Sequence, residues 1–225
     1  MNAALEGISD EVRAAHAHTG SWVAAVLRSR ISAGQLAPGT KLSEQKLSAA
    51  LGVSRNTLRE AFTVLAGESV VRRIPNRGVF VSAPQAEDVR EIYRVRRLIE
   101  PAAVLWGDYG AETLDGLDAI IDRARAALAA GSVPDMADAN QDLHKALVAL
   151  CGSASVAELM DKVLAQMRLV FHAMATMADF HSPYVERNAA LVAQLRAGHR
   201  VEAAAELRRY LDAAEHELLA RIGAR

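Results

Sequence analysis

The chain has 225 residues, enough for one or two domains with substantial hydrophobic cores. Hydrophobic residues make up 51% of it and aromatic residues only 4%, a composition that favours a mostly helical protein. The single cysteine, Cys151, excludes an internal disulfide, and we expect it to be a small buried residue before Gly152. No apolar run approaches the roughly 18 residues of a membrane span, so we expect a soluble, cytoplasmic protein with no membrane partner.

The formal net charge of −1 conceals an asymmetry along the chain. Residues 1–83 contain 10 Lys and Arg against 6 Asp and Glu, whereas residues 84–225 contain 16 against 21. A basic first part beside an acidic second part is expected of a nucleic-acid-binding module joined to a domain that does not bind nucleic acid.

Residues 1–18 show no sustained hydrophobic periodicity, and we expect a loose arm in which His16 and His18 are solvated. A first helix is predicted over residues 21–31, because its apolar residues recur on one face. Gly34 ends this helix.

The stretch from Ser43 to Leu65 predicts two short helices joined by a turn, as in a helix-turn-helix. Ser43 can cap the first helix, Gly52 ends it, and Ser54 can cap the second. The second helix has one apolar stripe, which we expect to be buried. Its members are Leu58, Ala61, Phe62 and Leu65.

The polar residues of the second helix fall on the side opposite this stripe. Arg55 and Arg59 are neighbours four residues apart, with Asn56 and Thr57 beside them. Arginine can pair bidentately with guanine and asparagine with adenine, and threonine can reach phosphates. The helix start is therefore equipped to enter a DNA major groove, although an ordinary solvated helix would have the same pattern.

A β-hairpin is predicted directly after this helix. Residues 70–74 and 79–81 suggest two short strands, and the sequence PNRG at residues 75–78 has strong turn chemistry. The hairpin adds a wing with Arg77 at its tip, and a winged helix-turn-helix strengthens the DNA-binding interpretation.

This part of the chain resembles the GntR family of bacterial transcription regulators. The resemblance runs in order from Ile31 to Val81 with family-like spacing and includes LSE at 42–44, LGVSR at 51–55, LREA at 58–61 and NRGxFV at 76–81. We predict that the DNA-contacting residues are Ser43, Gln45, Ser54, Arg55, Asn56, Thr57, Arg59, Asn76, Arg77 and Gly78.

The pattern changes after a short boundary near Pro84, so we place a winged helix-turn-helix domain at residues 1–83 and a second domain at residues 84–225. Amphipathic helices are predicted at residues 85–108, 111–130, 134–151, 155–180, 184–197 and 200–222. They indicate an antiparallel all-α bundle, which can hold a ligand in its core. We expect Pro101 to kink the first of them and Ser182-Pro183 to separate the fourth from the fifth.

The winged helix, short linker and VRxxxE motif at residues 95–100 resemble the FadR branch of the GntR family, whose C-terminal part is the FCD domain. This resemblance implies a homodimer that binds a small effector, commonly a carboxylate. It also often implies a divalent metal held by an Asp or Asn, a His four residues on, and two later histidines.

Asn140 and His144 match the first pair of metal ligands, but Asn188 and Tyr210 stand where the family has histidines. Amide and neutral phenol groups are poor ligands for a transition metal. We therefore predict no metal cofactor, with weak binding through Asn140 and His144 left open. A core histidine with satisfied hydrogen bonds is the plainer interpretation of His144.

The predicted effector site comprises Arg96, Asn140, His144, Asn188 and Tyr210. The resemblance points Arg96 inward, where its guanidinium could clamp a carboxylate bidentately. Alternatively, Arg96 and Glu100 are four residues apart and form an ion pair of little value on the helix surface.

The sequence thus predicts a homodimeric transcription regulator, a repressor in the commoner family outcome, that binds palindromic double-stranded operator DNA and responds to an effector. One alternative is a metal-dependent enzyme using His144, although no paired carboxylates, nucleophile elbow or phosphate loop accompany it. The other is a helical interaction protein whose bundle is filled and binds no ligand.

Overall fold

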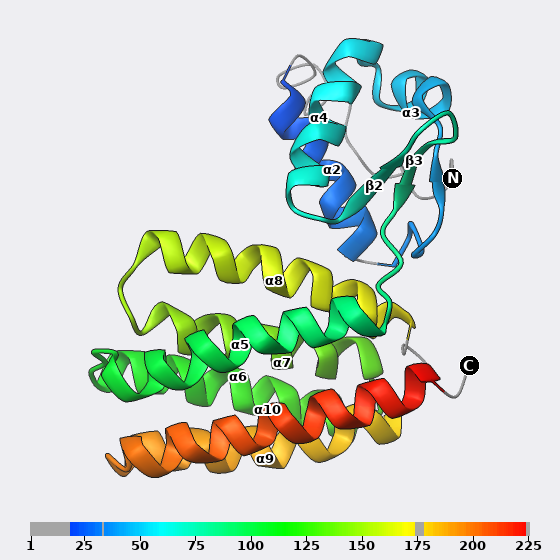
Figure 1. Cartoon of the computed structure of the whole chain (residues 1–225). Helices are drawn as coiled ribbons and strands as arrows, with labels where there is room; N and C mark the ends of the chain where they lie inside the picture. The colour runs from blue at the N-terminus through cyan, green and yellow to red at the C-terminus, as the bar shows by residue number, and fades with distance from the viewer. Residues whose placement is uncertain (1–18, 33, 174–177, 224–225) are drawn as a thin grey trace. The chain divides into compact units, whose positions relative to one another are not determined.

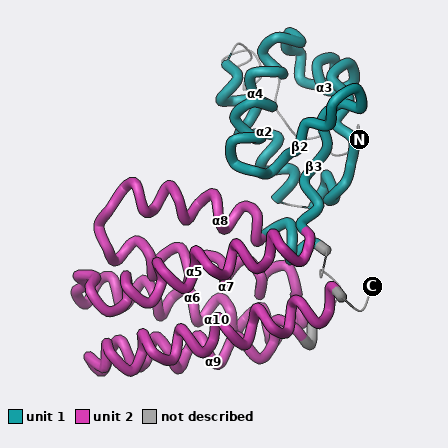
Figure 2. Tube along the Cα trace, in the orientation of Figure 1, with its two compact units in different colours: residues 1–84, 168–173 teal, residues 85–167, 174–225 magenta. Residues whose placement is uncertain are grey.

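The computed structural model describes residues 19–32, 34–173 and 178–223, so the predicted N-terminal arm with His16 and His18 lies outside the described residues (Figure 1). Contacts divide the chain into two compact units, residues 1–84 with 168–173, and residues 85–167 with 174–225 (Figure 2). Among the described residues, no helix combines the length and the hydropathy needed to cross a membrane.

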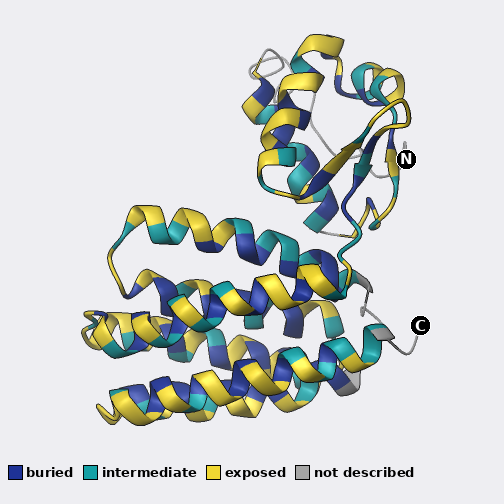
Figure 3. Ribbon diagram, in the orientation of Figure 1, coloured by how far each residue is buried: buried dark blue, intermediate teal, exposed yellow. Residues whose placement is uncertain are grey.

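The first unit has the fold of a winged helix-turn-helix. Its elements are α2 (Gly20–Ser32), β1 (Lys41–Leu42), α3 (Glu44–Leu51), α4 (Arg55–Gly67), β2 (Val71–Ile74) and β3 (Gly78–Val81). The three predicted helices and the predicted hairpin are therefore confirmed. The core of the unit forms where α2 packs against α4, and the predicted stripe of α4 is buried (Figure 3).

The wing is a three-stranded antiparallel sheet in the order β1-β3-β2. Arg72 of β2 and Lys41 of β1 both pair with Phe80 of β3, on opposite sides of it. The sequence did not predict β1, because two residues are too few to show the alternation that marks a strand. Its pairing with β3 defines it as a strand.

The second unit is an all-α bundle, as predicted. Its helices are α5 (Ala86–Trp106), α6 (Ala111–Ala129), α7 (Val133–Ala149), α8 (Ala154–Ala173), α9 (Ala178–Arg196) and α10 (Arg200–Gly223), although residues 168–173 at the end of α8 fall in the first unit. Helix α5 packs against α7 and α10, and α6 packs against α7 and α9. The polar residues predicted to line an effector site therefore lie on helices that are packed against one another.

Two expectations for the second unit are wrong. Helix α9 begins at Ala178 and runs through Pro183, where we expected two helices to separate. Proline lacks an amide hydrogen, and so near the beginning of a helix it costs a single backbone hydrogen bond. Cys151 is exposed and not buried, because α7 ends at Ala149 and Cys151 follows in the turn that leads to Gly152.

Candidate functional site

The start of α4 is a capped helix end. Ser54 Oγ accepts a hydrogen bond from the Thr57 amide at 3.1 Å and lies 2.9 Å from the Thr57 hydroxyl. Gly52, in the turn before it, has φ 67°, a left-handed conformation that glycine adopts without steric cost. The cap and the turn together fix the direction in which the first residues of α4 project.

The polar face of α4 projects away from the core. Arg55, Asn56 and Arg59 are exposed, whereas Leu58 and Phe62 have no exposed surface. Arg55 makes no ion pair within the described part of the chain. Arg59 is different, because Glu44 from α3 binds its guanidinium at 3.1 Å. The predicted recognition residues are thus brought together on one exposed surface.

The two predicted residues of α3 lie at its beginning. Ser43 caps the helix, its Oγ accepting a hydrogen bond from the Lys46 amide at 3.4 Å. Gln45 is exposed in the first turn. Since Glu44 lies between them and contacts Arg59, the start of α3 adjoins the polar face of α4.

The tip of the wing presents the other predicted DNA contacts. Asn76, Arg77 and Gly78 are exposed, and Asn76 and Gly78 have positive φ angles of 59° and 107° that form the tight turn. The guanidinium of Arg77 lies 5.9 Å from the centre of the Phe80 ring, and Lys41 Nζ lies at the same distance from it. The wing therefore carries two positive charges close to an aromatic ring.

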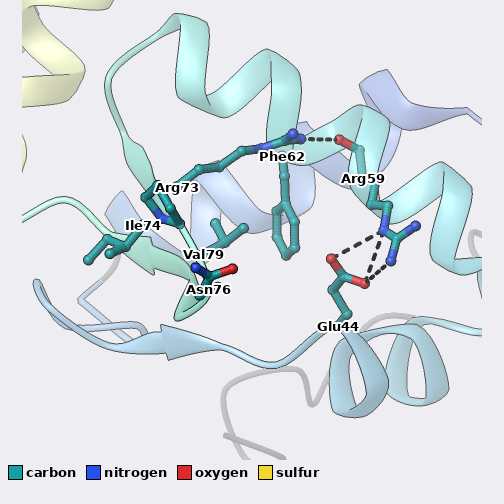
Figure 4. Close-up of a pocket in the computed structure, with 9 residues that line it drawn as sticks. Glu44, Arg59, Phe62, Arg73, Ile74, Asn76 and Val79 are labelled. Atoms are coloured by element: carbon teal, nitrogen blue, oxygen red, sulfur yellow. Dashed lines mark hydrogen bonds and ion pairs between the residues drawn. The ribbon is translucent and has the colours of Figure 1, made fainter.

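An open pocket of about 310 Å³ lies where α3, α4 and the wing meet (Figure 4). Its lining residues are Glu44, Arg59, Phe62, Arg73, Ile74, Pro75, Asn76, Gly78 and Val79. Two of them, Glu44 and Arg73, contact Arg59 and were not among the predicted site residues. Their sequence positions give no signal of this contact, which depends on how α3, α4 and β2 meet.

A buried ion pair lies at the centre of the helical unit. Arg96 is 1% exposed and Glu100 is 0% exposed, and Arg96 Nε donates to Glu100 Oε1 at 2.5 Å. The other carboxylate oxygen, Oε2, lies 2.7 Å from Nδ1 of His144, which is also buried. The expectation of a surface pair between Arg96 and Glu100 is therefore wrong, because both residues lie on the buried stripe of α5. Glu100 belongs to the site, and the sequence-based prediction omitted it.

The remaining predicted residues continue the same network. Tyr210 lies with its hydroxyl 3.3 Å from His144 Nε2 and 3.0 Å from Asn140 Oδ1, to which it donates. Asn188 donates through Nδ2 to the same Asn140 oxygen at 2.9 Å. The structure thus brings the five predicted effector-site residues together into one hydrogen-bonded chain with Glu100.

The charges in this network are balanced internally. Burial alone would raise the pKa of Glu100, but Arg96 and His144 overcome it and lower this pKa to about 2. Burial lowers the pKa of His144, and the opposing effect of Glu100 does not reverse this shift. At neutral pH the network therefore holds a guanidinium, a carboxylate and a neutral imidazole, with no net charge.

The hydrogen positions on His144 follow from these protonation states. An ionised carboxylate can only accept hydrogen bonds, so Nδ1 of His144 carries the hydrogen and donates it to Glu100. Nε2 is then an acceptor, and it competes with Asn140 for the one hydroxyl hydrogen of Tyr210. Because Asn140 is closer to that hydroxyl, the contact between Nε2 and Tyr210 is the weaker of the two.

Two buried atoms of the network have no hydrogen-bond partner among the described residues. They are Nη2 of Arg96, a donor, and Oδ1 of Asn188, an acceptor. Buried polar groups in proteins are nearly always hydrogen-bonded, to water or to a ligand if not to the protein. The network is therefore suited to a polar ligand that offers both an acceptor and a donor.

The same residues do not suit the divalent metal that the family resemblance implies. The positions that would supply ligands hold one imidazole, two amides and a phenol, and the Asn140 oxygen already accepts two hydrogen bonds. Tight zinc binding needs three or four strong ligands such as imidazole, thiolate or carboxylate. The described residues contain no group of three or more His, Cys, Asp or Glu side chains arranged to hold a metal.

Both units match known protein families. Residues 19–81 match bacterial regulatory proteins of the gntR family, and residues 91–213, more than half of the chain, match the FCD domain. The chain belongs to the GntR family. It is a DNA-binding transcriptional regulator of the FadR-like branch, and its family is not one of enzymes.

Relatives of known structure resemble the whole chain. A GntR transcriptional regulator from Rhodococcus sp. RHA1 is 39% identical with a TM-score of 0.84, over 89% of this chain and 97% of that one. E. coli McbR/YncC shares the fold at 19% identity with a TM-score of 0.73, over 90% of this chain and 97% of that one.

Curated relatives match about a third of the chain. The gluconate operon transcriptional repressor of Bacillus licheniformis is 43% identical over 84 residues, 37% of this chain and 34% of that protein. The transcriptional repressor RspR of Escherichia coli is 39% identical over 77 residues, 34% of each chain. This GntR regulator therefore aligns with about a third of the length of these two repressors.

Proposed function

We propose that this GntR regulator is a homodimeric repressor in which two α4 helices read the half-sites of a palindromic operator. In this proposal residues 1–83 bind DNA, and residues 84–225 dimerise and bind a small carboxylate effector that shifts the placement of the DNA-binding domains. An effector can do so only through different affinities for the two arrangements. Repression is supported by the two relatives above, which are repressors and each align with about a third of this chain.

The start of α4 carries the DNA-binding part of the proposal. Its cap fixes the helix end, its leucines anchor it in the core, and Arg55, Asn56 and Arg59 face outward. Such a helix end fits a major groove, where the two arginines can donate to guanine O6 and N7. We assign Arg77 in the wing a phosphate or minor-groove contact that positions the domain.

Arginine substitutions test this assignment. A duplex selected from a random pool by the wild-type protein serves as the probe, and binding is measured by gel shift across a salt series. Arg55→Ala or Arg59→Ala should weaken binding to it about 10- to 100-fold and relax the selected sequence, since each bidentate base contact is worth roughly 1–3 kcal/mol.

Arg77→Ala is the comparison variant, because the loss of Arg77 should weaken binding to all duplexes alike and reduce the salt dependence of binding. Unchanged affinity for the selected duplex in both α4 variants would refute the assignment of α4.

The effector part of the proposal rests on the buried network of the helical unit. Arg96 Nη2 is an unpartnered buried donor that can bind one oxygen of a carboxylate. Glu100 already neutralises this guanidinium, so an added carboxylate would bring an unbalanced negative charge into the site. We therefore expect carboxylate binding to take up a proton and to strengthen as the pH falls.

Thermal shifts with a panel of small monocarboxylates and dicarboxylates test the effector proposal, because a ligand that binds only the folded protein raises its melting temperature. We expect at least one carboxylate to give a shift that is larger at pH 6 than at pH 8. Arg96→Met should abolish the shift, whereas Glu100→Gln, which releases the guanidinium, should enlarge it.

The panel also separates the alternatives. No shift with any carboxylate would favour a bundle that binds no effector of this class. Near-stoichiometric zinc in protein purified without chelators would contradict the interpretation of the donor set.

A further inference from the structure

Glu44 holds the side chain of Arg59 in one orientation. Arg59 Nε lies 3.3 and 3.1 Å from the two carboxylate oxygens of Glu44, and Nη2 lies 3.1 Å from Oε2 (Figure 4). Glu44 is the first residue of α3 and is itself placed by the Ser43 cap. The contact therefore joins the two helices of the helix-turn-helix.

The carboxylate occupies only one side of the guanidinium. An arginine has five N–H donors, and the Nε hydrogen and one Nη2 hydrogen form one fork of parallel donors. Glu44 binds this fork. The second fork, formed by Nη1 and the other Nη2 hydrogen, has no ion pair within the described residues, and 61% of the side chain is exposed. A fork of this kind matches the O6 and N7 acceptors of guanine in the major groove.

The backbone of Arg59 is fixed as well. Arg73 of β2 donates through Nη2 to the Arg59 carbonyl oxygen at 2.9 Å (Figure 4). It also donates to the Thr63 hydroxyl at 2.8 Å. Thr63 donates to the same carbonyl oxygen at 2.9 Å. Arg59 is thus held by α3 through its side chain and by the wing through its main chain.

We propose that Glu44 is a positioning residue for sequence recognition, which orients Arg59 so that its free fork meets a guanine. The inference rests on the proposed role of Arg59 in DNA reading. It predicts a change in DNA affinity of unusual sign, because removing an acidic group near DNA ordinarily strengthens binding to phosphates. Loss of Glu44 should instead weaken specific binding, because the long Arg59 side chain would have to be ordered during association.

Three variants of the full chain separate orientation from charge. Glu44→Gln removes the charge. Glu44→Asp keeps the charge but shortens the side chain by one methylene group, so it no longer reaches Arg59 in the same geometry. Glu60→Gln is the matched control, since Glu60 is an exposed acid on α4 that forms no ion pair with Arg59 within the described residues. Glutamine can still accept the hydrogen bond that Glu60 accepts from Asn56 at 3.4 Å.

Two DNA duplexes serve as probes. The first is the duplex that the wild-type protein selects from a random pool. The second is the same duplex with one base pair replaced, at the position where Arg59→Ala no longer selects a base. Fluorescence anisotropy at fixed salt gives both affinities, and circular dichroism checks that each variant is folded. We expect Glu44→Gln and Glu44→Asp to lower affinity for the selected duplex about three- to tenfold and to reduce discrimination between the two probes. Glu60→Gln should leave the discrimination unchanged.

Equal or higher affinity of Glu44→Gln for both probes, as for Glu60→Gln, would overturn the inference. Failure of the proposed role of Arg59 looks different, because Arg59→Ala would then select the same sequence as the wild-type protein. In the double variant Glu44→Gln with Arg59→Ala, the Glu44 substitution should have no further effect on base preference.

Discussion

Arg96, Glu100 and His144 form a buried charged group in which each member depends on the next. Removing two ions from water carries a desolvation cost that their attraction offsets only when the geometry is good and the other hydrogen bonds are made. Here both carboxylate oxygens of Glu100 have partners, and the guanidinium of Arg96 also lies 5.0 Å from the Tyr93 ring centre. The group is therefore expected to tolerate the loss of both ions better than the loss of one.

A double-mutant cycle tests this dependence. Arg96→Met or Glu100→Leu alone leaves one buried charge unpaired and should lower the free energy of unfolding by about 3–5 kcal/mol. The double variant should cost clearly less than the sum of the two. Urea unfolding followed by circular dichroism gives these values. As a control, Arg90→Ala breaks an exposed pair with Glu87 and should cost less than about 1 kcal/mol. Additive losses at Arg96 and Glu100 would contradict the prediction.

Part of this arrangement could be predicted at the level of residues. Arg96 and Glu100 fall on the same stripe of α5 as Val89 and Tyr93, so the helical period places both inside. The contact of Glu100 with His144 joins residues 44 positions apart, and no local pattern specifies it. The same holds for Glu44 and Arg59, which meet because the turn between α3 and α4 brings two helices together.

Elements with strong local signals were predicted well. Helix α4 has a serine cap, a glycine in the preceding turn and one apolar stripe, and these signals agree with one another. Helices α5, α6 and α7 begin and end within two residues of the predicted positions, because glycine or proline marks their limits. Local consistency of this kind is what makes a sequence specify one fold.

Elements that depend on tertiary pairing were not predicted. Strand β1 exists because Leu42 pairs with Val79 of β3, a contact that a stretch of two residues cannot predict. Helix α9 continues through Pro183 because Phe180 and His181 before it and Tyr184 and Val185 after it are buried. In each case packing overrides a weak local preference.

At the scale of the whole molecule, one face of the helical unit is more apolar than a monomer needs. Leu98, Trp106 and Val201 are 75%, 80% and 67% exposed, and all three line a groove of about 650 Å³ between α5 and α10. Small residues such as Ala102 and Ala205 also line the groove, which allows close approach of another helix. Contiguous exposed apolar surface on packed helices indicates a protein interface.

We predict that this groove is part of the interface of the proposed homodimer. A two-fold interface places the same patch on both subunits, so one substitution acts twice. Leu98→Asp, which adds a charge, or Trp106→Ser, which removes a large apolar side chain, should raise the dimer dissociation constant at least tenfold. Sedimentation velocity over a concentration series measures it. Leu159→Asp is the matched control, because Leu159 is an exposed leucine, 45% accessible, on α8 and outside this groove. A dimer that is equally stable in Leu98→Asp and in Leu159→Asp would place the interface elsewhere.

Variants with weaker dimers should also bind a duplex with two half-sites less tightly, while their affinity for a single half-site should not change. The reason is that two linked recognition helices gain affinity from their effective concentration.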